Sequence, residues 1–351
     1  MLKKEIKHIL PYLSPSELLK FFNDTPINRA LNGKNLKPGE SEPIKYLSLF
    51  DYLSTIPTKF LYDPKYISLY HNTALKITNK LVAEGLLSNW GTKTGINQQF
   101  QGNGYDGQKM HYNSYDFLIY GFPEVIDYYR DAIQIIEVVE HNTQKVDVGT
   151  GFAILYDHKK QYFITAKHCI PKDSEIRINI FLNFPDGYSH PENIFVHVDN
   201  YVDIAILEFS DKKLISDKFF VLESPYILDN ILVSGFPPIP GTSDAVLVSS
   251  TGEITAMANT YFHKYQQIYV NANVKGGSSG SPIINNYGNV VGIIIESPRD
   301  IVNNNLQDEL RFGTGLTSDL IFALLESINK QGELHKKVEF KVNPNQSFSL
   351  I

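Results

Sequence analysis

Three short segments carry a histidine, an aspartate and serines, the side chains that together can perform nucleophilic catalysis. His168 follows an apolar run that ends near Thr165, Asp203 precedes another apolar run, and Ser279 lies in a loop rich in glycine and serine. A serine hydroxyl is a poor nucleophile until a neighbouring base takes its proton, and the imidazole base needs a carboxylate to fix its tautomer and orientation. These residue types are therefore typical of covalent catalysis in which a serine attacks, a histidine is the base and an aspartate orients the histidine.

Each of these residues has competitors. The chain holds 10 histidines, and most histidines are ordinary surface or core residues. Asp199 lies close to Asp203, but four apolar residues follow Asp203 and indicate that it enters a core, where an unpaired carboxylate would be costly. Ser278 and Ser281 flank Ser279 in the same loop. The residue types alone leave the choice among these serines open.

The motifs around these residues resemble those of the trypsin-like (chymotrypsin-fold) serine peptidases, especially the HtrA-like bacterial and cytoplasmic branch. Thr-Ala-Lys-His-Cys ends at Cys169, Asp-Ile-Ala-Ile-Leu begins at Asp203, and Gly-Ser-Ser-Gly-Ser-Pro begins at Gly277. The order His, Asp, Ser is also that of this family. The resemblance covers about residues 126–330 and selects Ser279, which has glycine two before it, glycine next and proline three after.

The resemblance implies a mainly β fold, with two six-stranded β-barrels over about residues 130–215 and 225–316 and a C-terminal helix. It implies a serine endopeptidase that acts on protein substrates through an acyl-enzyme intermediate, without a metal or cofactor. It also places the amides of an oxyanion hole on Gly277 and Ser279. Such N–H groups stabilise the negative charge that develops on the attacked carbonyl.

The primary specificity pocket would be lined by Asn273, six residues before Ser279. Because this residue is not an acid, cleavage after Lys or Arg is not expected. Glutamyl endopeptidases of similar sequence carry a histidine where this chain has Ile294, so a glutamate preference is not expected either. Ile294, Ile295 and Glu296 should run beside an extended substrate, and the isoleucines indicate a small or medium apolar preference.

Cys169 is the one cysteine in the sequence, so an intramolecular disulfide and a zinc site made mainly of cysteine are excluded. In secreted relatives the matching cysteine pairs with an upstream cysteine; here we expect a small buried apolar side chain. No stretch reaches the roughly 18 apolar residues that span a bilayer. Residues 1–11 begin basic but lack the apolar segment and cleavage site of a signal peptide. We therefore expect a cytoplasmic protein with no membrane partner.

Residues 1–124 have a pattern distinct from the rest of the chain. Two segments with helical spacing precede a polar, glycine-rich stretch, the outline of a winged helix: Leu13–Phe22, Thr73–Leu87 and Gly91–Gly107. Ser14 and Ser16 are candidate caps of the first helix. Asn32–Glu42 is rich in charged and turn-forming residues and predicts a loop. This part is expected to be a mainly helical regulatory or adaptor domain.

The net charge of the N-terminal part indicates which class of ligand residues 1–124 could bind. Residues 1–125 hold 14 of the 32 Lys and Arg and 11 of the 38 Asp and Glu, a net charge of +3, which leaves −9 for the remainder. A surplus of three is not a phosphate-binding stripe, so nucleic acid is disfavoured. A protein partner or activator is the favoured ligand of residues 1–124.

Residues 125–335 form the expected protease domain, in which short β-type runs alternate with turns. The predicted strands are Ala132–Val139, Phe152–Tyr156, Gln161–Thr165, Ile176–Phe181, Ile194–Val198, Ile204–Phe209, Ile231–Gly235, Ala245–Ser249, Gln267–Val274, Ser281–Asn285 and Asn289–Ile295. A final helix follows, with Ser318 as its cap and Gly332 after its end. Residues 336–351 are expected to be a tail or an extra strand.

The sequence also bears on how the expected peptidase activity would be controlled. No Ile-Val-Gly-Gly sequence stands near residue 126, so activation through a newly cut, buried amino terminus is not expected. Residues 1–124 carry no catalytic motif and are the candidate for control. A bacterial stress or defence pathway would suit this organisation. The alternatives are a catalytically silent protease-fold binding module and a DNA-responsive regulatory protease.

Overall fold

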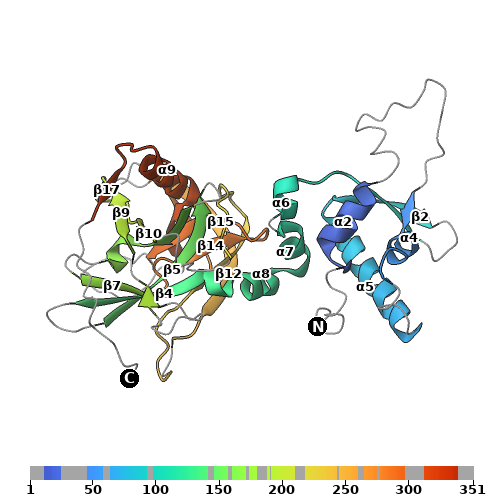
Figure 1. The fold of residues 1–351 in the computed structure, drawn as a ribbon, viewed down its shortest axis with the longest axis horizontal. Helices are drawn as coiled ribbons and strands as arrows, with labels where there is room; N and C mark the ends of the chain where they lie inside the picture. The colour runs from blue at the N-terminus through green and yellow to red at the C-terminus, as the bar shows by residue number, and fades with distance from the viewer. Residues whose placement is uncertain are drawn as a thin grey trace. The chain divides into compact units, whose positions relative to one another are not determined.

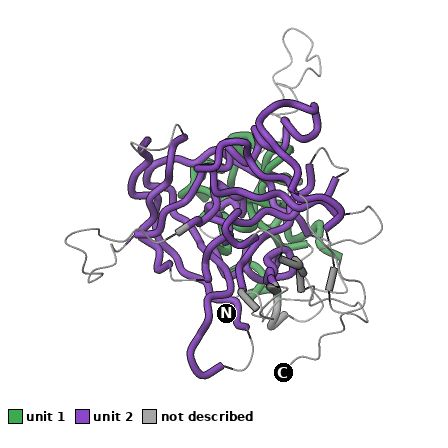
Figure 2. Tube along the Cα trace, turned by 90° about the vertical axis from the view of Figure 1, so that its left-hand side faces the viewer, with its two compact units in different colours: residues 1–121 green, residues 122–351 purple. Residues whose placement is uncertain are grey.

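The computed structural model divides into two compact units, residues 1–121 and 122–351, which Figure 2 colours separately. The described residues are 12–24, 46–57, 64–92, 98–111, 113–140, 146–156, 160–170, 174–179, 188–189, 191–209, 218–242, 245–259, 265–274, 277–296 and 312–338. The predicted loop Asn32–Glu42 lies outside them. The expected boundary after residue 124 falls close to the division between the units.

Unit 1 combines helices with a small antiparallel sheet (Figure 1). Its elements are α2 Pro15–Asn23, β1 Leu47–Ser48, α4 Leu49–Leu53, α5 Pro64–Ala83, β2 Leu87–Thr92, β3 Gln98–Gly102, α6 Gly107–His111 and α7 Ser114–Tyr120. The strand order is β1-β3-β2, so a hairpin follows the long helix α5 and a short strand precedes it. Leu18, Leu81 and Phe100, from α2, α5 and β3, are among the side chains of one buried cluster. Helices and hairpin follow one another in the order predicted for a winged helix.

The first predicted helix is confirmed, with one of its two candidate caps. The Ser14 hydroxyl accepts the N–H of Glu17 at 3.1 Å, so Ser14 is the N-cap of α2. Ser16 lies inside the helix instead. Its N–H and its hydroxyl both donate to Asp116 Oδ1 at 2.9 Å, which joins α2 to α7.

The second predicted helix, Thr73–Leu87, has the wrong limits. The structure extends α5 back to Pro64 and ends it at Ala83. Gly85 follows with φ of +72°, a left-handed conformation that terminates the helix before β2 begins. The predicted glycine-rich stretch, Gly91–Gly107, includes the end of β2 and all of β3, which pairs with β2.

Unit 2 begins with helix α8 and contains the β-rich part of the chain (Figure 1). The elements of its first half are α8 Phe122–Tyr129, η3 Arg130–Ala132, β4 Ile133–Glu140, β5 Val146–Tyr156, β6 Lys160–Thr165, η4 Lys167–Cys169, β7 Ser174–Asn179, β8 Tyr188–Ser189, β9 Asn193–His197 and β10 Ala205–Glu208. Their sheet has eight strands in the order β17-β9-β10-β6-β5-β4-β7-β8. Among the described residues this sheet does not close, whereas a six-stranded barrel was predicted. One added strand, β17 (His335–Lys337), overlaps the start of residues 336–351, which were expected to be a tail or an extra strand; residues 339–351 lie outside the described residues.

The second half of unit 2 is a closed barrel of six strands, as predicted. Its strands are β11 Asn230–Gly235, β12 Val248–Asn259, β13 Gln266–Val270, β14 Pro282–Asn285, β15 Val290–Glu296 and β16 Gly313–Thr317. The order around the barrel is β11-β12-β13-β16-β15-β14. Apolar side chains that point inward, among them Ile231, Ile268 and Val291, form its core.

Three local predictions in this half are wrong. Strand β12 runs on past the predicted end at Ser249, because Gly252 fits closely against Ala272 and does not interrupt the strand. Strand β16 was not predicted. Ser318 does not cap helix α9 (Ser318–Asn329): its hydroxyl donates to the carbonyl of Glu223 at 2.6 Å. Gly332 does follow the end of the helix, as predicted, and Gln331 before it takes a positive φ of +54°.

Candidate active site

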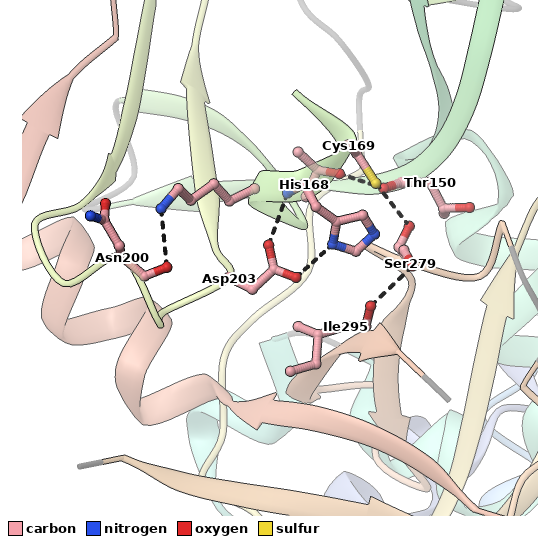
Figure 3. A network of polar contacts seen from close by, with 9 residues as sticks. Thr150, His168, Cys169, Asn200, Asp203, Ser279 and Ile295 are labelled. Atoms are coloured by element: carbon pink, nitrogen blue, oxygen red, sulfur yellow. Dashed lines mark hydrogen bonds and ion pairs between the residues drawn. The ribbon is translucent and has the colours of Figure 1, made fainter. Parts of the chain in front are cut away.

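The structure places His168, Asp203 and Ser279 together between the two halves of unit 2 (Figure 3). His168 lies in the 3-10 helix η4, directly after strand β6. Asp203 precedes strand β10, and Ser279 precedes strand β14. Strands β6 and β10 are neighbours, with Thr165 paired to Ala205. This pairing brings the ends that carry the histidine and the aspartate to one edge of the sheet.

His168 and Asp203 form a two-point contact. The backbone N–H of His168 donates to Asp203 Oδ1 at 2.8 Å, and the ring Nδ1 meets Oδ2 at 2.6 Å. The Asp203 carboxylate, helped by Cys169, raises the pKa of His168 to about 10, although partial burial of the ring opposes the shift. The contact with Asp203 therefore favours the protonated form of the His168 ring.

The Ser279 hydroxyl is hydrogen-bonded to a backbone carbonyl and not to the histidine. Its Oγ donates to the carbonyl oxygen of Ile295 at 3.0 Å (Figure 3). An imidazolium has no free acceptor nitrogen and cannot accept the serine proton. Before the serine proton can pass to the histidine, His168 must therefore be in its neutral form and the Ser279 hydroxyl must leave the Ile295 carbonyl.

The loop around Ser279 is shaped by two glycines. Gly277 and Gly280 have φ of +87° and +86°. A Cβ atom on Gly280 would lie 1.9 Å from the carbonyl oxygen of Thr150, and one on Gly277 would lie 2.9 Å from Pro237 Cα. Both positions therefore combine a left-handed backbone with a close approach, which only glycine tolerates without strain.

Thr150 is a positioning residue for which the sequence indicated no role. Its N–H donates to the Ser279 carbonyl at 3.1 Å, and its hydroxyl donates to the Gly277 carbonyl at 3.1 Å. The same hydroxyl accepts the N–H of Phe236 at 2.9 Å. Thr150 thereby joins strand β5 to the serine loop of the other half. Its neighbours Gly149, Gly151 and Phe152 have no titratable side chain, and no local pattern marked Thr150.

The competing residues lie elsewhere. Asp199 accepts the N–H of Tyr201 with its carboxylate and does not contact His168. Ser278 and Ser281 are 6% and 0% exposed, so neither hydroxyl is accessible to a substrate. Among the three serines of the loop, Ser279 is the one that the structure leaves partly exposed.

Cys169 is half-buried, not fully buried as expected. Its Sγ lies 3.8 Å from the Ser279 carbonyl oxygen (Figure 3). Gly149 faces it from strand β5, and a Cβ atom on Gly149 would lie 2.8 Å from that sulfur. The position opposite Cys169 is thus held by a residue without a side chain.

The expected specificity residues separate into two groups. Asn273 is exposed, and its N–H donates to Ser250 Oγ at 2.9 Å. Ile294 is fully buried in the barrel core, and its N–H and carbonyl bond to Ser281 and Gly280 at 2.9 and 2.8 Å. Its side chain therefore does not face a substrate, contrary to the expectation. Ile295 offers its carbonyl beside Ser279, while Glu296 ends strand β15.

Residues 149–293 match the family of the trypsin-like peptidase domain. The match spans the His168, Asp203 and Ser279 segments together with most of the closed barrel. This part of the chain therefore has a trypsin-like fold, with a C-terminal helix after it and a helical region before it. A search of curated proteins found no match to the chain.

Solved structures of low sequence identity were also found. The HtrA-type protease AlgW with a tripeptide is 18% identical, with a TM-score of 0.46, over 60% of this chain and 64% of that protein. A protease from M. tuberculosis in its active form is 21% identical, with a TM-score of 0.43, over 58% and 83%. A serine endoprotease from Yersinia pestis is 21% identical, with a TM-score of 0.44, over 60% and 67%. The chain thus spans less than two thirds of the length of AlgW.

Two further observations concern only the part of the chain that the structure describes. Its histidine, cysteine, aspartate and glutamate side chains form no cluster of three or more that could hold a metal ion. None of its helices has the length and apolar character to cross a membrane.

Proposed function

We propose that this chain is a serine endopeptidase in which Ser279 is the nucleophile, His168 the base and then the acid, and Asp203 the residue that orients it. The observation that carries the proposal is the two-point contact of His168 with Asp203, beside a serine loop that glycine and Thr150 hold in place. A trypsin-like domain over residues 149–293 supports it.

The reaction starts when His168 loses its proton and Ser279 rotates about its Cα–Cβ bond from the Ile295 carbonyl to the ring. Staggered side-chain wells interconvert readily on a partly exposed residue, so this rotation is a small step. The serine oxygen then attacks the substrate carbonyl while its proton passes to His168. The amides of Gly277 and Ser279 hold the oxyanion. His168 donates the proton to the leaving amine, and water hydrolyses the acyl-enzyme by the same steps.

The substrate itself favours this rotation. A peptide laid beside strand β15 would donate its own N–H to the Ile295 carbonyl, in competition with the Ser279 hydroxyl. The displaced hydroxyl would then be free to meet the histidine. Binding of substrate is in this way coupled to alignment of the nucleophile.

A fluorophosphonate probe tests the assignment, because it reacts with a serine only where a base and an oxyanion hole activate it. We expect one adduct, on Ser279, that disappears in Ser279→Ala and persists in Ser278→Ala. Ser278 is the matched control because its side chain is buried in the same loop. A folded protein with no adduct would instead support the catalytically silent binding module.

The proposal extends to control by residues 1–124. Unit 1 has its own buried cluster, separate from the barrel core. It can therefore serve as an adaptor for a protein activator of a cytoplasmic enzyme in a bacterial stress or defence pathway. The test compares peptide cleavage by the full chain and by a protein that begins at Phe122, with and without candidate activators. Equal rates under all conditions would exclude control by unit 1.

A further inference from the structure

The loop that presents Asp203 is covered by the C-terminal strand. Strand β17 pairs antiparallel with β9, and His335, Lys336 and Lys337 lie opposite His197, Val196 and Phe195. The N–H of Val198 donates to the Leu334 carbonyl at 2.9 Å, at the point where the chain leaves β9 for the loop. The pairing therefore reaches the first residue of the loop 198–203. Strand β17 lies outside the residues that match the peptidase family.

Asn200 is the point where two lysines contact this loop, and Figure 3 shows one of the two contacts, with the lysine next to His168. Lys336 Nζ, from β17, donates to Asn200 Oδ1 at 3.0 Å. Lys167 Nζ, from the residue next to His168, donates to the Asn200 carbonyl at 3.3 Å. The loop that carries the acid is thus connected to both the C-terminal strand and the helix that carries the base.

The inner side of the same loop rests on a buried histidine. His197 is 1% exposed, and its Nδ1 accepts the N–H of Asp199 at 2.9 Å. Burial lowers the pKa of His197, which keeps the ring neutral and Nδ1 able to accept. Its Nε2 faces the hydroxyl of Tyr265, and Asp199 also accepts the N–H of Tyr201. The turn before Asp203 is therefore fixed on its inner side, while Asn200 is fixed on its outer side.

The contacts of the two Asp203 carboxylate oxygens require the loop to be positioned accurately. One bonds to the His168 backbone and the other to its ring, at 2.8 and 2.6 Å. A shift of the loop by a few tenths of an ångström lengthens both contacts, and small errors of position at a catalytic group have large effects on rate.

We propose that Lys336 and Asn200 are positioning residues of the peptidase site, and that strand β17 clamps the loop 198–203 so that Asp203 engages His168 at both oxygens. The inference rests on the proposed function for its kinetic consequence. Its geometric consequence, the state of the His168–Asp203 pair, can be measured whether or not the chain cleaves peptides.

Two matched pairs of substitutions in the full chain test the clamp. Lys336→Met removes the contact with Asn200, and Lys337→Met removes the neighbouring exposed lysine, whose side chain lies on the other face of the strand. Lys336→Pro and Lys337→Pro test the backbone hydrogen bonds between β17 and β9, because proline has no N–H to donate. Two backbone hydrogen bonds fix the alternation along β17: the N–H of Val198 donates to the Leu334 carbonyl, and the N–H of Val338 donates to the Ile194 carbonyl. By alternation the N–H of Lys336 points to β9 and that of Lys337 points away from it.

We expect Lys336→Met to lower kcat about fivefold with KM unchanged, because an exposed charge-assisted hydrogen bond is lost and no substrate contact is touched. Lys336→Pro should lower kcat tenfold or more. In both variants, NMR titration should show a lower pKa of His168 and faster exchange of its backbone amide. Lys336→Arg should restore both readouts, and Lys336→Met combined with Asn200→Ala should be no worse than Asn200→Ala alone.

Two results would overturn the clamp: unchanged kcat and unchanged His168 signals in Lys336→Pro, or equal effects of the substitutions at Lys336 and Lys337. If the proline variant does not fold, kcat and the His168 signals of Lys336→Met decide the question instead. If the wild type shows no peptidase activity but the His168 signals change in the Lys336 variants alone, the clamp stands and the proposed function fails.

Discussion

Replacing Asp203 with asparagine tests whether the His168–Asp203 pair has the electrostatic role assigned to it. The carboxylate meets His168 Nδ1 at 2.6 Å and raises the pKa of His168 from 6.5 to about 10. At 1.36 kcal/mol per unit, the full shift of 3.5 units would correspond to about 4.8 kcal/mol. The histidine side chain is 51% exposed and the aspartate side chain 26%, so solvent screening reduces this energy. We expect about 1–2 kcal/mol to remain.

The sign of the effect follows from the raised pKa. The pair stabilises the folded state fully below pH 6.5, where His168 is protonated in both the folded and the unfolded protein. The stabilisation is lost as the pH rises through about 10. Asp203→Asn should therefore lower the free energy of unfolding by about 1–2 kcal/mol at pH 6, and by much less at pH 10.

Two measurements check this prediction. NMR titration of labelled histidine, assigned with His168→Gln, should show the pKa of His168 falling by about one unit or more in Asp203→Asn. Urea unfolding at pH 6, 8 and 10 should show the pH-dependent loss of stability, and peptide cleavage should fall by about 10³–10⁴. Asp199→Asn is the control, since Asp199 does not contact the ring. An unchanged pKa of His168, or the same loss of stability at pH 6 and pH 10, would refute the reasoning.

Three further substitutions test the packing around the serine loop. Gly280→Ala should destabilise the fold by about 2–4 kcal/mol, because its Cβ would lie 1.9 Å from the Thr150 oxygen; Gly241→Ala, with φ of +87° but no atom within 4 Å, should cost only about 1 kcal/mol in the same thermal or urea unfolding. Thr150→Val keeps the shape but removes two hydrogen bonds, so we expect a loss of about 1–3 kcal/mol and slower labelling of Ser279 by the fluorophosphonate probe; unchanged labelling would contradict its positioning role. Gly149→Cys should form a disulfide with Cys169 on mild oxidation, raising stability by about 3 kcal/mol. Two thiols remaining on titration would show that the backbone cannot supply the small shift that the bond needs.

The sequence could single out the candidate site residues because the local structure around them restricts the residue types. Thr-Ala-Lys-His-Cys and the glycines beside Ser279 carry the constraints of a strand end and of a left-handed turn, and both constraints are local. The short β-type runs predicted a β-rich half, and the resemblance to trypsin-like peptidases implied the closed six-stranded barrel that the structure contains. The same reasoning placed the hairpin of strands β5 and β6, which the structure confirms.

What could not be predicted depends on contacts between distant residues. Ser318 has the ideal residue type for a helix cap, but the Glu223 carbonyl, 95 positions away, takes its hydroxyl. Ile294 looked like a substrate contact because of its place in a motif, although the inward face of strand β15 buries it. Thr150 and Lys336 contact partners in loops far away in the sequence, Gly277 and Asn200. No local pattern marks such residues.

The pairing of β17 with β9 also has a consequence for the timing of synthesis. His335 lies opposite His197, so the edge of β9 stays uncovered while 138 further residues are made. At 5–20 residues per second this interval lasts about 7–30 s. An uncovered strand edge is a site for wrong pairing between chains. Until β17 is made, a nascent chain would hold the loop 198–203 by its inner contacts alone, so synthesis itself would delay the final positioning of Asp203.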